Sequence, residues 1–251
     1  MRILSKAKIY LFLVFCLIHP NKSEAGRRAF IWTWDTENLK QGDVEIEQWL
    51  WWVGHKTNPS GWIWFSPIFG ITDRIEIAFP WEIQSNNLGT KLTNFTAESR
   101  IRIGDLEDTN FFHHSIRLYY QQNMIHPYNR TRYNVPWFGT NYIMSFGNVS
   151  KAHTTIDLGI YSDLENNAQR ALTIQTLGAG YTTPIHKNMR VGLEYFHEIG
   201  LSSSYKNFKH YFLGPNFSYS KGNVWITLGA LKGLSSDTPN FMQRLILSIA
   251  L

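Results

Sequence analysis

Charged side chains of both signs recur at alternate positions along much of this sequence. In the run from Arg74 to Gln84, residues Arg74, Glu76 and Glu82 share one parity, and apolar or aromatic residues take the other. Because successive side chains of a strand point to opposite faces, this alternation predicts a strand with one polar face. Carboxylates and guanidinium groups on such faces would either line a hydrated path for solutes or pair into a network that closes it.

The polar faces of the predicted strands hold a mixed set of acids and bases. We expect the following residues to line the lumen: Glu45, Glu47, Arg74, Glu76, Glu82, Glu98, Arg100, Arg102, Arg117, Asp157, Arg190, Glu194, Glu198 and Arg244. Since the two signs are balanced, the sequence does not indicate selectivity for cations or anions. An open pore and a sealed lumen are both compatible with this set.

Catalytic and metal-binding patterns are weak by comparison. His113 and His114 are adjacent, so on a strand they point to opposite faces and cannot hold one metal ion together. A lipid-hydrolysing triad would need a serine beside a histidine, and Ser99 or Ser115 near His114 is the nearest approximation, with Ser115 pointing the opposite way. We therefore predict no enzyme activity, no metal site and no cofactor.

The first 25 residues have the features of a secretory signal peptide. Basic residues precede an apolar run from Ile9 to Ile18, and the small residue Ala25 ends a cleavage motif. Four of the 24 basic and one of the 19 acidic residues lie in this segment, so its removal lowers the net charge from +5 to +2. No basic stripe is left for nucleic acid. The single cysteine, Cys16, also lies there, so the exported chain cannot form disulfides.

The remainder of the chain reads as a series of long amphipathic strands separated by turn residues. About twelve are predicted, over 43–54, 60–70, 73–84, 93–104, 111–123, 138–148, 152–162, 170–183, 188–199, 207–219, 222–232 and 240–251. A strand that crosses a bilayer at a tilt needs about 9 to 11 residues, and these strands are long enough. The predicted fold is all-β: a closed antiparallel transmembrane β-barrel over 43–251, preceded by an N-terminal periplasmic segment over 26–42.

Connections and aromatic residues support a membrane location. Predicted connections alternate between brief turns and longer external loops, of which 124–137 is the longest, and an even strand count places both termini on the periplasmic side. Rings gather near predicted strand ends, where the two aromatic girdles of a membrane barrel would lie. These residues are Trp49, Trp51, Trp52, Trp62, Trp64, Trp81, Trp137, Phe138 and Trp225.

Two hairpins resemble those of a known family. The run from Phe65 to Ile77 is similar to a hairpin common in Gram-negative outer-membrane proteins, especially the meta-pathway phenol-degradation family of transporters. Residues 211–215 and 225–229 resemble the penultimate hairpin of the same proteins. The resemblance implies an outer-membrane channel for small molecules and carries no catalytic residue. The chain departs from the usual pattern at Leu251, where such barrels end in Phe or Trp.

The sequence therefore predicts a bacterial outer-membrane barrel that forms a narrow channel or transporter for small solutes. A structural or surface-interaction barrel with a sealed lumen is the main alternative, and a lipid-modifying enzyme is a weaker one. The expected partners are outer-membrane lipids, small solutes and the barrel-assembly machinery, which would recognise the C-terminal strand. Nucleic acid is not an expected partner.

Overall fold

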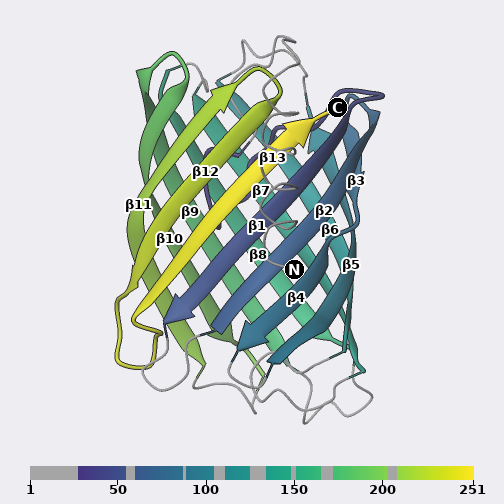
Figure 1. Cartoon of the computed structure of the whole chain (residues 1–251), viewed down its shortest axis with the longest axis vertical. Coiled ribbons are helices and arrows are strands. Elements are labelled where there is room, and N and C mark those ends of the chain that lie inside the picture. The colour runs from purple at the N-terminus through teal and green to yellow at the C-terminus, as the bar shows by residue number, and fades with distance from the viewer. Residues whose placement is uncertain are drawn as a thin grey trace, which may run out of the picture.

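The chain folds into a single barrel of antiparallel strands (Figure 1). The computed structural model describes residues 28–54, 60–86, 89–104, 111–124, 134–147, 151–164, 172–202 and 208–251. The predicted signal peptide and most of the predicted loop 124–137 lie outside these residues. Within the described ranges, no helix is long and apolar enough to cross a bilayer.

Thirteen strands make up the sheet. They are β1 (Val44–Gly54), β2 (Ser60–Thr72), β3 (Ile75–Ala78), β4 (Trp81–Asn86), β5 (Gly89–Ile103), β6 (Phe112–Asn123), β7 (Pro136–Gly147), β8 (His153–Asp163), β9 (Thr173–His186), β10 (Met189–Gly200), β11 (Lys209–Lys221), β12 (Val224–Gly233) and β13 (Phe241–Ala250).

The first and last strands close the barrel. β1 pairs with β2 on one side and with β13 on the other, with Glu45 opposite Ala250. Beyond the end of β13, the backbone N–H of Leu251 donates to the carbonyl of Val44 at 2.9 Å. Every strand thus has two neighbours, and the sheet has no open edge of the kind that would leave unpaired backbone groups in lipid.

The predicted strand 73–84 is divided into β3 and β4, which occupy one position in a twelve-stranded barrel. The break falls at Phe79 and Pro80, because proline has no N–H to donate to a ladder. Hydrogen bonds continue on either side: the N–H of Phe79 reaches the carbonyl of Pro67 at 3.1 Å, and the N–H of Thr96 reaches that of Pro80 at 2.8 Å. The predicted number of barrel strands is confirmed.

The two ends of the barrel differ in their connections. One end, called the turn end here, holds the start of β1, the end of β13 and three two-residue turns, at 73–74, 187–188 and 222–223. Gly222 has a φ of 60°, which suits a tight turn. The opposite end, called the loop end, carries mostly longer connections, as expected. The connection after β4 is shorter than expected, because β4 continues to Asn86 and β5 begins at Gly89.

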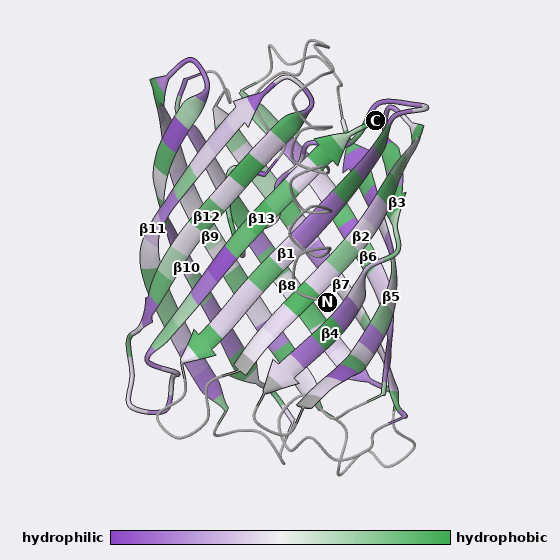
Figure 2. Ribbon diagram, in the orientation of Figure 1, coloured by the Kyte–Doolittle hydropathy of each residue, from purple (hydrophilic) through white to green (hydrophobic). Residues whose placement is uncertain are grey.

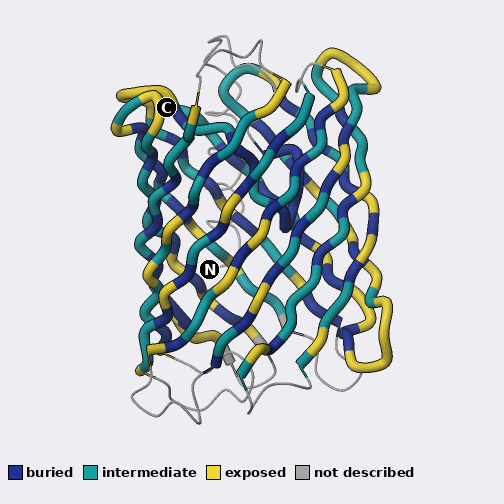
Figure 3. The backbone as a smooth tube through the Cα atoms, turned by 180° about the vertical axis from the view of Figure 1, so that it is seen from behind, coloured by how far each residue is buried: buried dark blue, intermediate teal, exposed yellow. Residues whose placement is uncertain are grey.

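Exposed and buried residues alternate along the strands, and so do hydrophobic and hydrophilic ones (Figures 2 and 3). The outer wall carries large apolar side chains such as Leu158, Leu193 and Leu228. A group of rings also faces outward on β2, β4 and β5 and between β3 and β4, where Phe79 stacks on Phe95 with centroids 6.4 Å apart. This apolar outside and polar inside are what a bilayer-spanning barrel requires.

The expected aromatic girdle is wrong for most of its members. Trp52, Trp81 and Phe138 are exposed on the outer wall. The remaining six, Trp49, Trp51, Trp62, Trp64, Trp137 and Trp225, are buried or half-buried on the inner face. Their parity explains this: Trp49 and Trp51 share a face of β1 with Glu45 and Glu47, both of which are buried.

The described chain before β1 lies inside the barrel from Arg28 to Leu39, and Lys40 to Asp43 are exposed. Residues 28–43, called the N-terminal segment here, include the described part of the region expected to be periplasmic. Ile31 and Trp32 pack in an apolar cluster with Val53, Phe196 and Phe212 from the wall. A second cluster joins Leu39 of the segment to Ile68 and Ala78. The segment enters the lumen because its apolar and aromatic side chains are buried there against the inner faces of the strands.

Candidate functional site in the barrel lumen

The inner wall gathers most of the charged residues that the sequence predicts for it. Eleven of the fourteen are buried, Arg102 and Glu198 are half-buried, and Arg74 is exposed. Arg74 is the exception because the strand begins at Ile75, which leaves Arg74 in the β2–β3 turn, where its guanidinium donates to the carbonyl of Gly104. The buried residues are Glu45, Glu47, Glu76, Glu82, Glu98, Arg100, Arg117, Asp157, Arg190, Glu194 and Arg244.

Glu194 binds the backbone of the N-terminal segment. This residue is fully buried on β10, and its carboxylate accepts three successive N–H groups. Ile31 donates at 3.0 Å, Trp32 at 2.6 Å and Thr33 at 2.5 Å. Because one side chain accepts three successive N–H groups, Glu194 is a main anchor of the segment.

Other wall carboxylates continue the same pattern along the segment. Asp157 on β8 accepts the N–H of Trp34 at 3.2 Å. Glu76 on β3 accepts the N–H of Leu39 at 2.8 Å. Strands far apart in the sequence therefore hold consecutive parts of one segment.

Asp35 of the segment makes a buried polar cluster with β7 and β8. Its carboxylate lies 2.9 Å from Nε2 of His153 and accepts a hydrogen bond from Ser145 at 2.8 Å. Burial by itself would raise the pKa of Asp35, but the charge and hydrogen bond of His153 outweigh it and lower that pKa to about 2. Asp35 is therefore ionised at neutral pH and bound to the wall.

Arginines of the wall clamp the two tryptophans of the segment. The Arg244 guanidinium lies 3.9 Å from the centroid of the Trp32 ring and donates to the carbonyl of Ile31 at 2.5 Å. Trp34 has three arginines against it: Arg117 from the wall at 3.9 Å, Arg28 of the segment itself at 4.0 Å, and Arg100 from the wall at 5.3 Å. Cation–π contacts in a desolvated place contribute about 2 kcal/mol each.

Further charges pair within the wall and between the wall and the segment. Arg28 lies 2.5 Å from Glu47, and Arg117 lies 2.7 Å from Glu98. Arg100 pairs with Glu76, which also binds the segment. Buried ion pairs tolerate little disturbance, because removing one partner leaves an uncompensated charge.

Glycines of the wall, which have no side chain, leave room for the segment where it passes. A Cβ added to Gly178 would lie 2.7 Å from Oγ1 of Thr33, and one on Gly180 would lie 2.3 Å from the Phe30 ring. Gly229 similarly faces Ile31, and Gly70 faces the backbone of Lys40. The segment and the wall are therefore fitted in shape as well as in charge.

A second polar group lies on the inner face nearer the loop end. Glu82 of β4 accepts hydrogen bonds from Thr93 at 2.6 Å and from Asn94 at 2.8 Å, and the indole N–H of Trp64 also donates to it. Trp64 stacks on Trp49 with centroids 4.9 Å apart. The inner wall near β1 and β2 is thus an aromatic surface bordered by charge.

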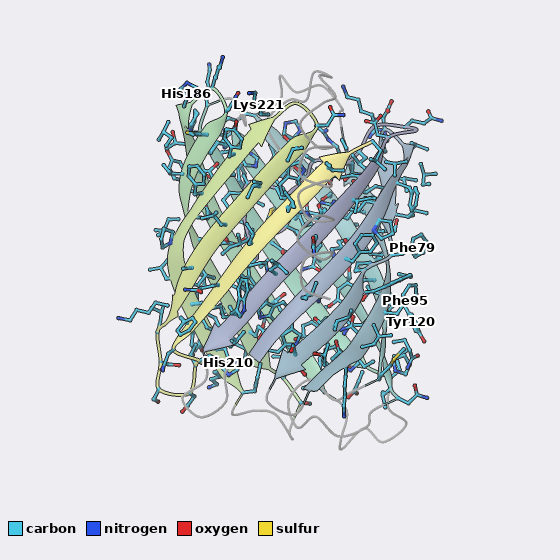
Figure 4. The ribbon with its side chains drawn as sticks, in the orientation of Figure 1. Phe79, Phe95, Tyr120, His186, His210 and Lys221 are labelled. Atoms are coloured by element: carbon cyan, nitrogen blue, oxygen red, sulfur yellow. The ribbon has the colours of Figure 1, made fainter. Side chains whose placement is uncertain are left out.

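The serines and the histidine considered for a lipid-hydrolysing site do not come together in the described residues. Ser115 is buried inside, whereas Nδ1 of His114 lies 2.9 Å from the hydroxyl of Tyr142 on the outer face. Ser99 lies opposite Leu118, four residues along β6 from His114. His186 and Lys221 lie at the turn end and His210 at the other end (Figure 4). In the described part of the chain, no three His, Cys, Asp or Glu residues are grouped so as to hold a metal ion.

Comparison with solved structures identifies the fold class. An outer-membrane channel from Pseudomonas putida F1 matches with a TM-score of 0.60 and 11% identity, over 86% of this chain and 98% of that one. The NanC porin matches with a TM-score of 0.58 and 8% identity, over 83% and 100% of the two chains. The KdgM porin gives 0.54 and 9%, over 82% and 98%. The chain therefore has the fold of outer-membrane β-barrels. No protein-family model and no curated protein sequence matches it.

The occupant of the lumen was not predicted from the sequence. The residues from Phe30 to Trp34 are mostly apolar or aromatic, yet they lie outside any strand pattern. A large apolar group in a segment expected to face water is the signal that pointed to burial. The receiving residues were predicted to face inward, but as a pore lining and not as a binding surface for the chain itself.

Proposed function

We propose that the chain forms a narrow channel or transporter for small solutes in the bacterial outer membrane. The observation that carries this is the closed barrel, whose outer wall is apolar and whose inner wall carries eleven buried charged side chains beside aromatic clusters. A polar interior enclosed by an apolar outer wall provides polar solutes with a path across a bilayer. Neither the lipid nor a fully packed protein interior provides such a path. The solved structures with the same fold are named as a channel and as porins.

The buried charged residues of the inner wall would shape that path. In this proposal the N-terminal segment fills part of the lumen and sets its width. The hairpin resemblance supports a relationship to the meta-pathway phenol-degradation transporters as part of this proposal. β13, which closes the barrel, would be the strand that the barrel-assembly machinery recognises.

A barrel with a sealed lumen is the second candidate, and the position of the N-terminal segment favours it. Carboxylates from β3, β8 and β10 all bind the segment, so these residues, which were expected to line a pore, are occupied by the chain itself. Such a protein would act through its loops or as a structural component of the membrane.

Conductance in planar bilayers separates the two candidates. The purified wild-type protein is inserted at a defined salt concentration, and its heat-modifiable mobility on a gel verifies the fold. Steady single-channel steps support the channel. A correctly folded barrel that is silent, and stays silent when the anchors of the N-terminal segment are removed, contradicts it.

A further inference from the structure

Residues Ile31–Asp35 lie in the lumen as a peptide lies in a receptor. Their backbone bends at 31–33 around groups of the wall: Glu194 accepts three successive N–H groups, Asp157 accepts a fourth, and Arg244 donates to a carbonyl. All three wall residues are buried. The partners come from β8, β10 and β13, so the site is assembled by the closed barrel.

The side chains of the segment add selectivity to this backbone binding. Trp32 and Trp34 are two residues apart and pack beside Trp51 and Trp49, which have the same spacing on β1. Arg244 covers the Trp32 ring. The two ring pairs match in spacing, so this surface holds two tryptophans that are two positions apart.

The wall also has the shape of a receptor. Gly178 and Gly229 leave room for Thr33 and Ile31, and a Cβ at either position would overlap them. His153 completes the site by holding the acidic side chain of Asp35. Backbone anchors, two ring positions and an acid-binding histidine together define one ligand chemistry.

We propose that the inner wall is a binding site for short peptides with tryptophans two positions apart, and that residues 31–35 occupy it as a tethered ligand. This inference names short aromatic peptides as the class of solute. Their transport, as opposed to their binding, rests on the proposed channel function. Only the stretch from Thr36 to Asp43 joins the ligand to β1, so its effective concentration is on the order of millimolar. A free peptide therefore competes poorly until the segment is weakened.

The test uses the full-length protein with both segment tryptophans replaced, W32A/W34A. A fluorescein-labelled peptide of sequence Ile-Trp-Thr-Trp-Asp is titrated against this variant and against wild type in detergent, and anisotropy reports binding. We expect the variant to bind at least about tenfold more tightly, because its own ligand has lost both rings. The matched peptide with both tryptophans replaced by alanine should not bind, and empty micelles correct for partition of the labelled peptide into detergent.

Two results would overturn the inference. One is equal affinity of the peptide for wild type and variant, and the other is equal binding of the tryptophan and alanine peptides. If W32A/W34A does not fold, a competition on wild type replaces it: millimolar tryptophan peptide should speed trypsin cleavage after Arg28, and the alanine peptide should not. No acceleration there also overturns it.

The outcome stays distinct from that of the channel proposal. A barrel that conducts but shows no peptide binding contradicts the peptide site alone. A barrel that binds the peptide but never conducts contradicts the channel, and the site then serves only to hold the chain's own segment.

Discussion

Replacing Glu194 with alanine should release the N-terminal segment from the lumen. The carboxylate accepts three backbone N–H groups at 2.5 to 3.0 Å, and alanine leaves all three without a protein acceptor. A hydrogen bond to a charged group contributes about 1.5 to 3 kcal/mol, and water entering the lumen recovers part of that. We therefore expect the substitution to weaken the binding of the segment by about 3 kcal/mol, which shifts the equilibrium between bound and released segment by more than about a hundredfold.

Trypsin cleavage after Arg28 measures the released fraction. Arg28 is 6% exposed in the bound state, so the bond to Ala29 is cut only when the segment leaves the wall. When opening and closing are fast, cleavage follows the open population, and the rate for Glu194→Ala should rise by about a hundredfold. Mass spectrometry of the folded barrel identifies this product among cuts in the loops.

Glu198→Ala is the matched control, because Glu198 has the same parity on β10 and contacts Tyr161 and His210, which belong to the wall. Its cleavage rate should change by less than about threefold. Equal rates for the two variants, or no change for Glu194→Ala, would refute the assignment of Glu194 as an anchor.

Three further predictions follow from the same contacts. Gly178→Leu should expel the segment, because even a Cβ added at this position would lie 2.7 Å from Oγ1 of Thr33. It should therefore raise the single-channel conductance, and Gly178→Ala should raise it less. Leu158→Arg, which puts a charge on the outer wall midway along β8, should destabilise the barrel by about 2 to 4 kcal/mol in urea unfolding from vesicles, and Leu158→Ala by much less. Because the pKa of Asp35 falls from 3.8 to about 2 in the folded protein, its ionised form stabilises the bound segment by about 2 kcal/mol above pH 4. That stability should be lost between pH 4 and 2, so quenching of segment fluorescence by acrylamide should rise there, and a flat profile would contradict the Asp35 contact.

Much of the fold could be predicted from the sequence, because strand faces have a period of two that survives in local sequence. The alternation from Arg74 to Gln84 marked β3 and β4, and that at the C-terminus marked β13. Closure followed from the physics of a bilayer, which tolerates no unpaired sheet edge. The break at Pro80 was the detail that alternation alone did not reveal.

The tryptophans were misassigned for a reason that parity could have corrected. Rings near strand ends are typical of girdles, but Trp49 and Trp51 share the parity of Glu45 and Glu47. Assigning them by position along the strand and not by face put them on the wrong side. The inner wall is consequently more aromatic than the charge pattern suggested.

The path of the N-terminal segment could not be predicted, because its contacts are remote in the sequence. Glu194 lies 161 to 163 residues from the N–H groups that it accepts. The segment has no period of its own, and its backbone binds side chains that alternation had already assigned to a pore. Only the assembled barrel brings these partners together.

The central claim, that the N-terminal segment lies against the inner wall, is tested most directly by a disulfide between the two. A Cβ on Gly178 would lie 3.2 Å from Cβ of Thr33, close to the separation in a disulfide, and the chain after the predicted signal peptide contains no other cysteine. We predict that T33C/G178C oxidises in the membrane-embedded protein, whereas T33C/L177C, with the second cysteine on the outer face, keeps both thiols free for alkylation. Full alkylation of T33C/G178C would contradict the account.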